Sequence, residues 1–353
     1  MLDKLGSRRF LMPFVAIIAI FIVFGTSFYP ELHATPRDVP FAIVNLDQGP
    51  GGAAMVQKMQ DGAGAAASPI AWTKLDSQAA LDSAMADNQF YGALVIPAEF
   101  SSAQAGAAAG TGTPAPIQVT INQGKNPMLA TTMQAAITGM LAQAGLTAQV
   151  TQINTADIGG GSMGALMSVM IMVMPPMMMA MLSSVLLFLL FRPRRQTTTP
   201  ERVKAVGKQL GFAVVISAAI AGLALLLATW LGGLKIPAAP IFWFMWMAIW
   251  LVMVLFVGAL DLALPLGVLV VVGTFALGTT SAMFAPEMLP SFWQHWVYPW
   301  VPQRHMGDGI RSIIYMNGSP LDASLVPLLI AGAVGVVLLI VAIAAPTRHH
   351  PTS

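Results

Sequence analysis

Three groups of residues in this chain could carry chemistry, and the first is a glycine-rich turn. Gly49 to Ala54 (GPGGAA) follows a predicted strand and matches the G-x-G-x-x-A pattern of dinucleotide-binding folds, with Asp76 at the end of the next strand. However, Asp47 would lie beside the pyrophosphate and repel it. We therefore interpret the segment as a tight turn capped by the side chains of Asn45 and Asp47.

The second group is a set of methionines, whose thioethers suit Cu(I). They point to all sides of one predicted helix without an accompanying cysteine or histidine, so we expect them to pack adaptably around Pro175 and Pro176. The proline pair predicts a kink that frees backbone carbonyls, and this bend is either fixed or a gating hinge. The methionines are Met163, Met167, Met170, Met172, Met174, Met177, Met178, Met179 and Met181.

The third group consists of His295 and His305, in an aromatic stretch late in the chain. No carboxylate stands at ligand spacing beside them, so surface histidines are a better interpretation than a metal site. The sequence has no cysteine, no HExxH motif, no P-loop and no recognisable Ser-His-Asp arrangement. We therefore predict that the protein is not an enzyme and that it holds no cofactor or metal.

The composition is that of a membrane protein. Hydrophobic residues make up 56% of the 353 residues and charged residues 9%, whereas soluble domains carry about a quarter charged residues. The net charge of +2 is too small to indicate a nucleic-acid partner. Asp261 and Lys235 lie at the edges of predicted spans and no ionisable residue lies at a midplane position, so energy for any transport should come from a partner.

The topology follows from residues 164–191, an uncharged stretch long enough to cross a bilayer. Arginines at its end favour the cytoplasmic side, so the helix should run from outside to inside. This predicts six transmembrane helices with both termini in the cytoplasm. Ten of the 17 Lys and Arg residues would then lie inside: Lys4, Arg8, Arg9, Arg192, Arg194, Arg195, Arg202, Lys204, Lys208 and Arg348.

The predicted fold is an α-helical polytopic membrane protein with an extracytoplasmic α/β domain inserted between the first and second transmembrane helices. Its parts are the cytoplasmic N-terminus and first span (1–29), the α/β domain (30–163), the second span (164–191), a cytoplasmic coupling-type loop (192–209), the third to fifth spans (210–284), an extracytoplasmic re-entrant aromatic element (285–324), and the sixth span with a cytoplasmic tail (325–353). Within them, spans are expected at 10–29, 210–231, 241–260, 264–284 and 325–345.

Strand and helix patterns alternate in the α/β domain, which indicates one α/β core. Strands are expected at 41–45, 70–75, 91–96 and 117–121, and helices at 53–60, 77–86, 98–104 and 127–154, with Ser77 as an N-cap. Residues 105–116 should form a mobile loop, because alanine, glycine, threonine and proline offer little to pack. In the aromatic element, Pro290 and Pro302 should each start a short helix in the outer leaflet, where Trp293, Trp296, Tyr298 and Trp300 suit the headgroups. Arg311 should snorkel or pair with Asp308.

Residues 39–49 (VPFAIVNLDQG), 91–102 (YGALVIPAEFSS) and 121–127 (INQGKNP) resemble the external domain of the phage-infection-protein (Pip)-like family. Residues 284–315 resemble the element before the last span of that family and of ABC-2-type transporter permeases. The matching positions are Phe284, Pro286, Pro290, Phe292, Pro302 and Arg311.

The resemblance implies a permease half in the bacterial plasma membrane that forms a homodimer or heterodimer and pairs with a cytoplasmic ABC ATPase. It places Glu201, Arg202 and Lys204 at the coupling surface that faces the ATPase. It also marks Pro175 and Pro176, together with the matched positions of the aromatic element, as a candidate gating region.

Two functions fit these observations. The first is a permease subunit that exports amphiphilic or cell-envelope molecules and is energised by a separate ATPase. The second is a non-transporting envelope protein whose extracytoplasmic domain binds a partner protein, a phage or a secretion component.

The topology predicts that a reporter fused near Gly110 reads as extracytoplasmic, because an odd number of crossings precedes the α/β domain. Paired alkaline-phosphatase and green-fluorescent-protein fusions at this position measure it: phosphatase activity without fluorescence is expected. A fluorescent, inactive pair would contradict the predicted topology.

Overall fold

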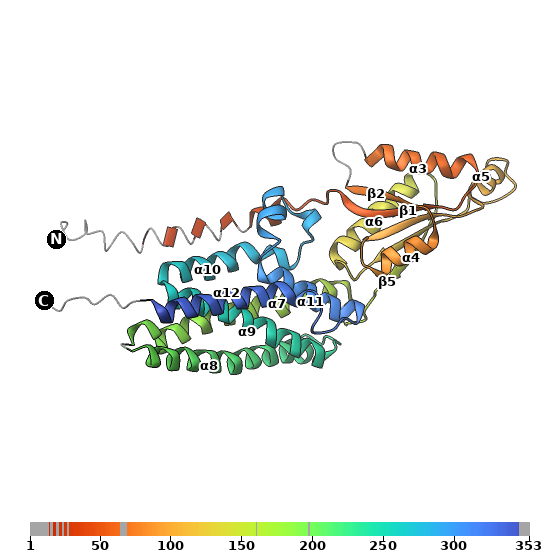
Figure 1. The fold of residues 1–353 in the computed structure, drawn as a ribbon. Helices are drawn as coiled ribbons and strands as arrows, with labels where there is room; N and C mark the ends of the chain where they lie inside the picture. The colour runs from red at the N-terminus through yellow and green to blue at the C-terminus, as the bar shows by residue number, and fades with distance from the viewer. Residues whose placement is uncertain are drawn as a thin grey trace.

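The computed structural model describes residues 28–63, 69–159, 161–196 and 198–345, together with isolated positions between 14 and 26. An α/β domain lies at one end of the molecule and a bundle of long helices extends from it (Figure 1). The predicted first span, 10–29, lies mostly outside the described residues. Its isolated described positions are helical, and those with large apolar side chains, such as Phe14 and Phe21, are exposed.

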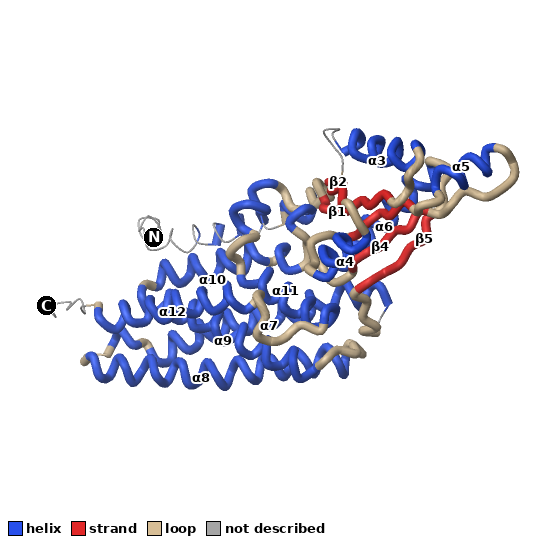
Figure 2. Tube along the Cα trace, turned by 45° about the vertical axis from the view of Figure 1, so that its right-hand side comes forward, coloured by secondary structure: helices blue, strands red, loops and turns tan. Residues whose placement is uncertain are grey.

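The α/β domain is built on a mixed five-stranded sheet of order β2-β1-β3-β4-β5 (Figure 2). The strands are β1 (Val39–Asn45), β2 (Ile70–Leu75), β3 (Gly92–Ile96), β4 (Ile117–Asn122) and β5 (Ala148–Ile153). Only β3 and β4 pair antiparallel. The helices between the strands are α3 (Pro50–Ala63), α4 (Gln78–Ala86), α5 (Phe100–Ala108) and α6 (Pro127–Gln143). The predicted α/β domain and four of its strands are thus confirmed.

The interior strand β1 is buried on both faces, which explains its nearly continuous apolar sequence. Phe41 and Ile43 belong to a core that includes residues of α3 and α6, whereas Ala42 and Val44 belong to a core with residues of α4. The sheet therefore separates two layers of side chains, one on each face.

The predicted long helix 127–154 is wrong in its second half. Helix α6 ends at Gln143, and Gly145 follows with φ of +71°, a left-handed conformation in which glycine meets no Cβ clash. The chain then forms β5, whose residues pair with β4 in parallel register. The expected loop 105–116 is likewise shorter than predicted, because α5 continues to Ala108.

The bundle contains four helices long and apolar enough to cross a membrane among the described residues. They are α7 (Gly161–Phe191), α8 (Thr199–Leu226) with its π-helical continuation η3 (Leu227–Leu231), α9 (Ala238–Leu262) and α12 (Leu325–Ala344). Helix α9 packs against α7, α8, α10 and α12 and is the most buried of the four. The protein is therefore a helical membrane protein whose α/β domain precedes its long helices.

The predicted span 264–284 is shorter than expected. Helix α10 (Leu264–Gly278) has 15 residues, hence a length of about 22 Å, which is less than the roughly 30 Å of a hydrocarbon core. Near its end, the side-chain amide of Gln303 in α11 (Pro302–Met316) donates to Thr274 O at 2.9 Å. A 3-10 turn, η4 (Thr280–Ala282), follows.

Helix α8 begins earlier than the predicted third span and absorbs residues 199–209 of the expected loop. Its N-cap is Thr198, and a capping box forms with Glu201. Pro200 lies in the first turn, where its missing N–H costs nothing. The connection from α7 to α8 is therefore short and contains the 3-10 turn η2 (Pro193–Arg195).

Glycines bring α9 and α12 into backbone contact. A Cβ built on Gly335 would lie 2.6 Å from the backbone of Leu255, and one on Gly258 would lie 2.4 Å from Gly335 O. Close approach of this kind is how helices associate in lipid, where the hydrophobic effect does not draw them together.

We expect Gly335→Val to destabilise the bundle by about 1–3 kcal/mol, because the added side chain must separate α9 from α12. The matched control is Gly273→Val in α10, where a Cβ meets nothing within 4 Å. Thermal unfolding in nanodiscs measures both. Equal melting temperatures for the two variants would contradict the packing described here.

Candidate functional site

The α/β domain is attached to the bundle through a short segment, residues 284–288, which includes the 3-10 turn η5 (Pro286–Met288). Arg37 N donates to Glu287 O at 2.9 Å and Thr35 N to Met288 O at 3.1 Å. Phe284 and Met288 pack into the core beneath the sheet. Phe284 and Pro286, expected in a re-entrant membrane element, thus lie at the junction with the α/β domain.

A polar cluster surrounds this segment on the side of the sheet. Tyr91 Oη donates to Glu287 Oε2 at 3.0 Å, and Lys125 Nζ lies 4.9 Å from the centroid of the Tyr91 ring while donating to Gln89 O. Burial raises the pKa of Tyr91 well above its usual value, and the Glu287 carboxylate adds to the increase. Burial also lowers the pKa of Lys125.

Helix α11 completes the cluster from the side of the bundle. Arg311 is buried, donates to Ala282 O at 2.9 Å, and pairs with Asp308 at 2.5 Å. Arg304 pairs with Asp308 at 3.2 Å and stacks on Tyr298, 4.3 Å from its centroid. Pairing between Arg311 and Asp308, one of two arrangements expected for this arginine, is confirmed. A cavity of about 480 Å³ lies between these residues and the sheet.

The aromatic element is less exposed than expected. Pro302 does begin α11, and a helical turn containing η6 (Trp293–Val297) follows Pro290. Yet Trp293 and Tyr298 are buried, whereas Trp296 and Trp300 are exposed, so only the last two are free to meet headgroups. Helix α11 itself packs between α7, α9 and α12.

The two histidines differ from each other. His295 is exposed, as expected, and its Nδ1 lies 2.8 Å from Ser291 O. His305 is buried rather than on the surface, with Nε2 3.2 Å from Pro299 O. In the described part of the chain, no group of three or more His, Asp or Glu residues could hold a metal ion.

The glycine-rich turn is held closed by the side chains expected to cap it. Asp47 accepts from Gly52 N at 2.9 Å and from the backbone and hydroxyl of Ser101, while Asn45 Oδ1 accepts from Asp47 N. These bonds lower the pKa of Asp47, the one from the Ser101 hydroxyl most of all. Because Gly51 N also donates to Ser101, the amides that would cradle a phosphate are already bonded.

At the far end of the bundle, the predicted coupling residues separate into two kinds. Glu201 and Lys204 are exposed, but Arg202 is buried and donates to Gln196 O, Ile343 O and Ala345 O. Arg202 thus binds the carbonyls at the C-terminal end of α12, where a cation is favourable. It does not face outward as expected.

A buried polar contact near this end was not foreseen. Asp261 belongs to the last turn of α9, and Gln209 Nε2 lies 3.4 Å from its Oδ1 and 3.4 Å from Leu187 O. Asp261 also borders a cavity of about 280 Å³ with Arg192, Arg194 and Arg195. In the sequence, the position of Asp261 four residues before Pro265 indicates a helix end. Its partner Gln209 lies 52 residues away, so no local pattern predicts the contact between them.

Pro175 and Pro176 lie inside α7, which continues as one helix through both. Nearby methionines point to both sides: Met172 and Met177 are fully buried, whereas Met178 and Met179 are exposed. The expectation that methionines surround the helix is confirmed for these residues. Lacking N–H groups, the prolines leave the carbonyls of Ile171 and Met172 without their regular helical donors.

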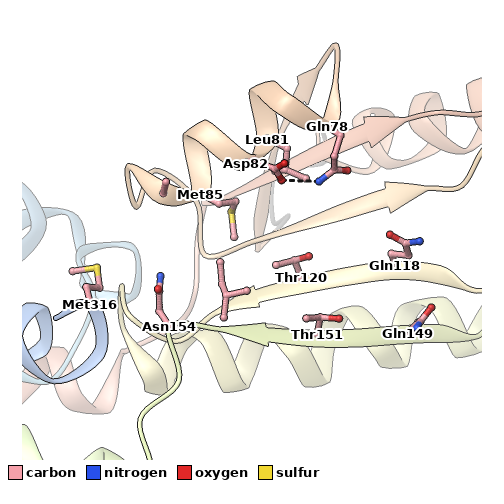
Figure 3. Close-up of a pocket in the computed structure, with 12 residues that line it drawn as sticks. Gln78, Leu81, Asp82, Met85, Gln118, Thr120, Gln149, Thr151, Asn154 and Met316 are labelled. Carbon is pink, nitrogen blue, oxygen red and sulfur yellow. Dashed lines mark hydrogen bonds between the residues drawn. The ribbon is translucent and has the colours of Figure 1, made fainter.

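The sheet face covered by α4 carries a polar groove of about 630 Å³. Figure 3 shows Gln118 and Thr120 of β4 beside Gln149 and Thr151 of β5, with Gln78 and Asp82 of α4 across from them. Gln78 Nε2 donates to Asp82 Oδ1 at 2.8 Å. The groove reaches Asn154 and Met316, so it ends at the junction with the bundle.

The architecture defines a class: a multi-pass helical membrane protein whose accessory α/β domain docks on the helix that precedes the last long span. The ABC-2 family transporter protein model matches residues 8–344, so the chain belongs to this family of non-catalytic transporter membrane subunits. No curated protein and no solved structure matches the chain.

We expect Asp308→Asn to destabilise the protein by about 3 kcal/mol, because it leaves the buried Arg311 guanidinium without its carboxylate. Asp157→Asn, which breaks the exposed Asp157–Lys235 pair, should cost less than about 1 kcal/mol. Thermal unfolding in nanodiscs compares them. Adding Arg311→Met to Asp308→Asn should restore part of the loss; no recovery would contradict the proposed cause.

Proposed function

We propose that the protein is the permease subunit of an ABC-2-type exporter of amphiphilic or cell-envelope molecules, energised by a separate ATPase. The observation that carries the proposal is the family match over residues 8–344, together with the four long apolar helices. Permeases of this family generally pair with an ABC ATPase. Within the family, the α/β domain and the residues quoted above favour the Pip-like group.

In this proposal the chain lies in the bacterial plasma membrane with six spans, both termini in the cytoplasm and the α/β domain outside. The described arginines and lysines support this orientation. Arg192, Arg194, Arg195, Arg202, Lys204 and Lys208 all belong to the end of the bundle remote from the α/β domain (Figure 1). Such a concentration is typical of the cytoplasmic side.

The start of α8 is the proposed contact with the ATPase. Its exposed face offers Glu201 and Lys204, while Arg202 ties the same turn to the end of α12. A displacement of this turn by the ATPase would therefore be transmitted to both α8 and α12. The proposed role of Arg202 is thus to hold the coupling turn in place rather than to contact the ATPase. The proposed gate comprises Pro175 and Pro176 in α7 together with Arg311 and the aromatic element.

The polar groove of Figure 3 favours the second function, a partner-binding envelope protein, as the alternative. The two proposals differ in what the protein must capture: an ATPase at the end of the bundle, or an external partner at the sheet. Co-purification of an ATPase with this protein would favour the first function, that of a permease subunit.

We expect the Glu201→Gln/Lys204→Gln double variant to reduce co-purification of an ABC ATPase from the native host by about tenfold, because charges at an interface set binding and specificity. Glutamine at position 201 preserves the capping box, so the helix should still form. The matched control is Lys235→Gln at the opposite end, which should leave capture unchanged. Absence of any ATPase from the wild-type complex would contradict the proposal.

A further inference from the structure

The α/β domain carries an apolar groove of about 1110 Å³ on the sheet face opposite to that of α4. Helix α3 packs over β1 and β2, and α6 packs over β4 and β5, so the groove lies between two helices that cover the same face at some distance. Its floor and walls include Met55, Ile70, Trp72, Phe100, Met140 and Leu146.

The groove is open because its helices present small residues to it. Ala54 of α3, Ala136 of α6 and Ala144, directly after α6, line it at positions where leucines would fill the space. Methionines from both helices supply flexible walls that adapt to ligands of different shape. Most ligand sites are concave, largely apolar and furnished with a few polar groups, and this groove has that character.

Lys58 is the only charged residue among the described residues that line the groove. Among the ion pairs of the described residues, none involves Lys58. The lining also includes other side chains that can donate hydrogen bonds: the amides of Gln104 and Gln143 and the indole N–H of Trp72. The lining thus combines a long apolar surface with one cation and two amides.

We propose that this groove binds a single-chain anionic amphiphile, with the acyl chain between α3 and α6 and the acidic headgroup at Lys58. The site lies towards the C-terminal half of α6, whereas Asn126, at the start of the same helix, bonds to Met283 at the junction. It is therefore separate from the polar cluster around Arg311. The proposal concerns binding and does not depend on the pairing with an ATPase.

The absence of cysteine from the sequence allows a direct test in the full-length protein. In nanodiscs of phosphatidylcholine, Ala136→Cys places one thiol in the groove, and Ala142→Cys places one on the exposed side of α6 outside it. The rate of alkylation by N-ethylmaleimide is followed by intact mass, with dodecanoate as the probe and dodecyltrimethylammonium as the cationic control. Gln143→Cys is the second reporter of the groove if Ala136→Cys does not fold.

Dodecanoate should slow alkylation of Ala136→Cys at least tenfold and leave Ala142→Cys unchanged, while the cationic control should slow neither. Octanoate, shorter by four methylenes, should need a concentration about two hundredfold higher, because each methylene contributes roughly 0.8 kcal/mol, a factor of about four in affinity. Lys58→Gln should raise the dodecanoate concentration required, whereas Lys235→Gln, an exposed lysine outside the groove, should not. Equal protection by the cationic amphiphile, protection only by an added peptide, or no protection would each overturn the proposal. None of these outcomes bears on the ATPase test.

Discussion

The arrangement of the whole molecule depends on one short segment, residues 284–288, which belongs to both halves. Its backbone accepts hydrogen bonds from Thr35 and Arg37 of the α/β domain, and its apolar side chains enter the core beneath the sheet. On its other side, Ala282 accepts from Arg311 and Met283 from Asn126. Because these backbone groups are satisfied across the junction, the two halves are fixed to each other by directional bonds in addition to apolar contact.

Helix α11 is the element through which this junction reaches the membrane helices. It is buried among α7, α9 and α12, and its charges are collected in the Arg304–Asp308–Arg311 cluster on the side of the sheet. A rotation of the α/β domain would act on Glu287 through its hydrogen bond with Tyr91. At the opposite end, Arg202 connects the start of α8 to the end of α12. The long helices are thus tied together at both ends, with α9 at their centre.

The sheet divides the α/β domain into two chemically different faces. The face beneath α4 bears a groove of amides and hydroxyls, whereas the face beneath α3 and α6 bears an apolar groove with a single lysine. This difference follows from the two-residue period of a strand, which places Ile117, Val119 and Ile121 on one side and Gln118 and Thr120 on the other. One domain therefore presents two chemically different surfaces.

The sequence by itself determined the features that depend on local chemistry and composition. Long uncharged stretches predicted the four long helices, alternating patterns predicted four strands, and the side chains of Asn45 and Asp47 predicted the capped turn. Each of these depends on neighbours within a few residues, or on the length of hydrocarbon to be crossed. The family resemblance to ABC-2 permeases was also readable from the residues around Phe284 and Arg311, and the family match confirms it at that level.

Only the tertiary structure decided the features that depend on residues far apart. Whether residues 148–153 continue a helix or form a strand was settled by β4, which supplies the edge for β5 to pair with. Gln303 bonds to Thr274 near the end of α10 from 29 residues away, and Arg202 turns inward because the carbonyls of Ile343 and Ala345 lie within reach. Both grooves likewise arise from helices that meet only in the fold. Local patterns cannot report these partners, because a hydrogen bond between residues 141 positions apart leaves no periodicity in the sequence.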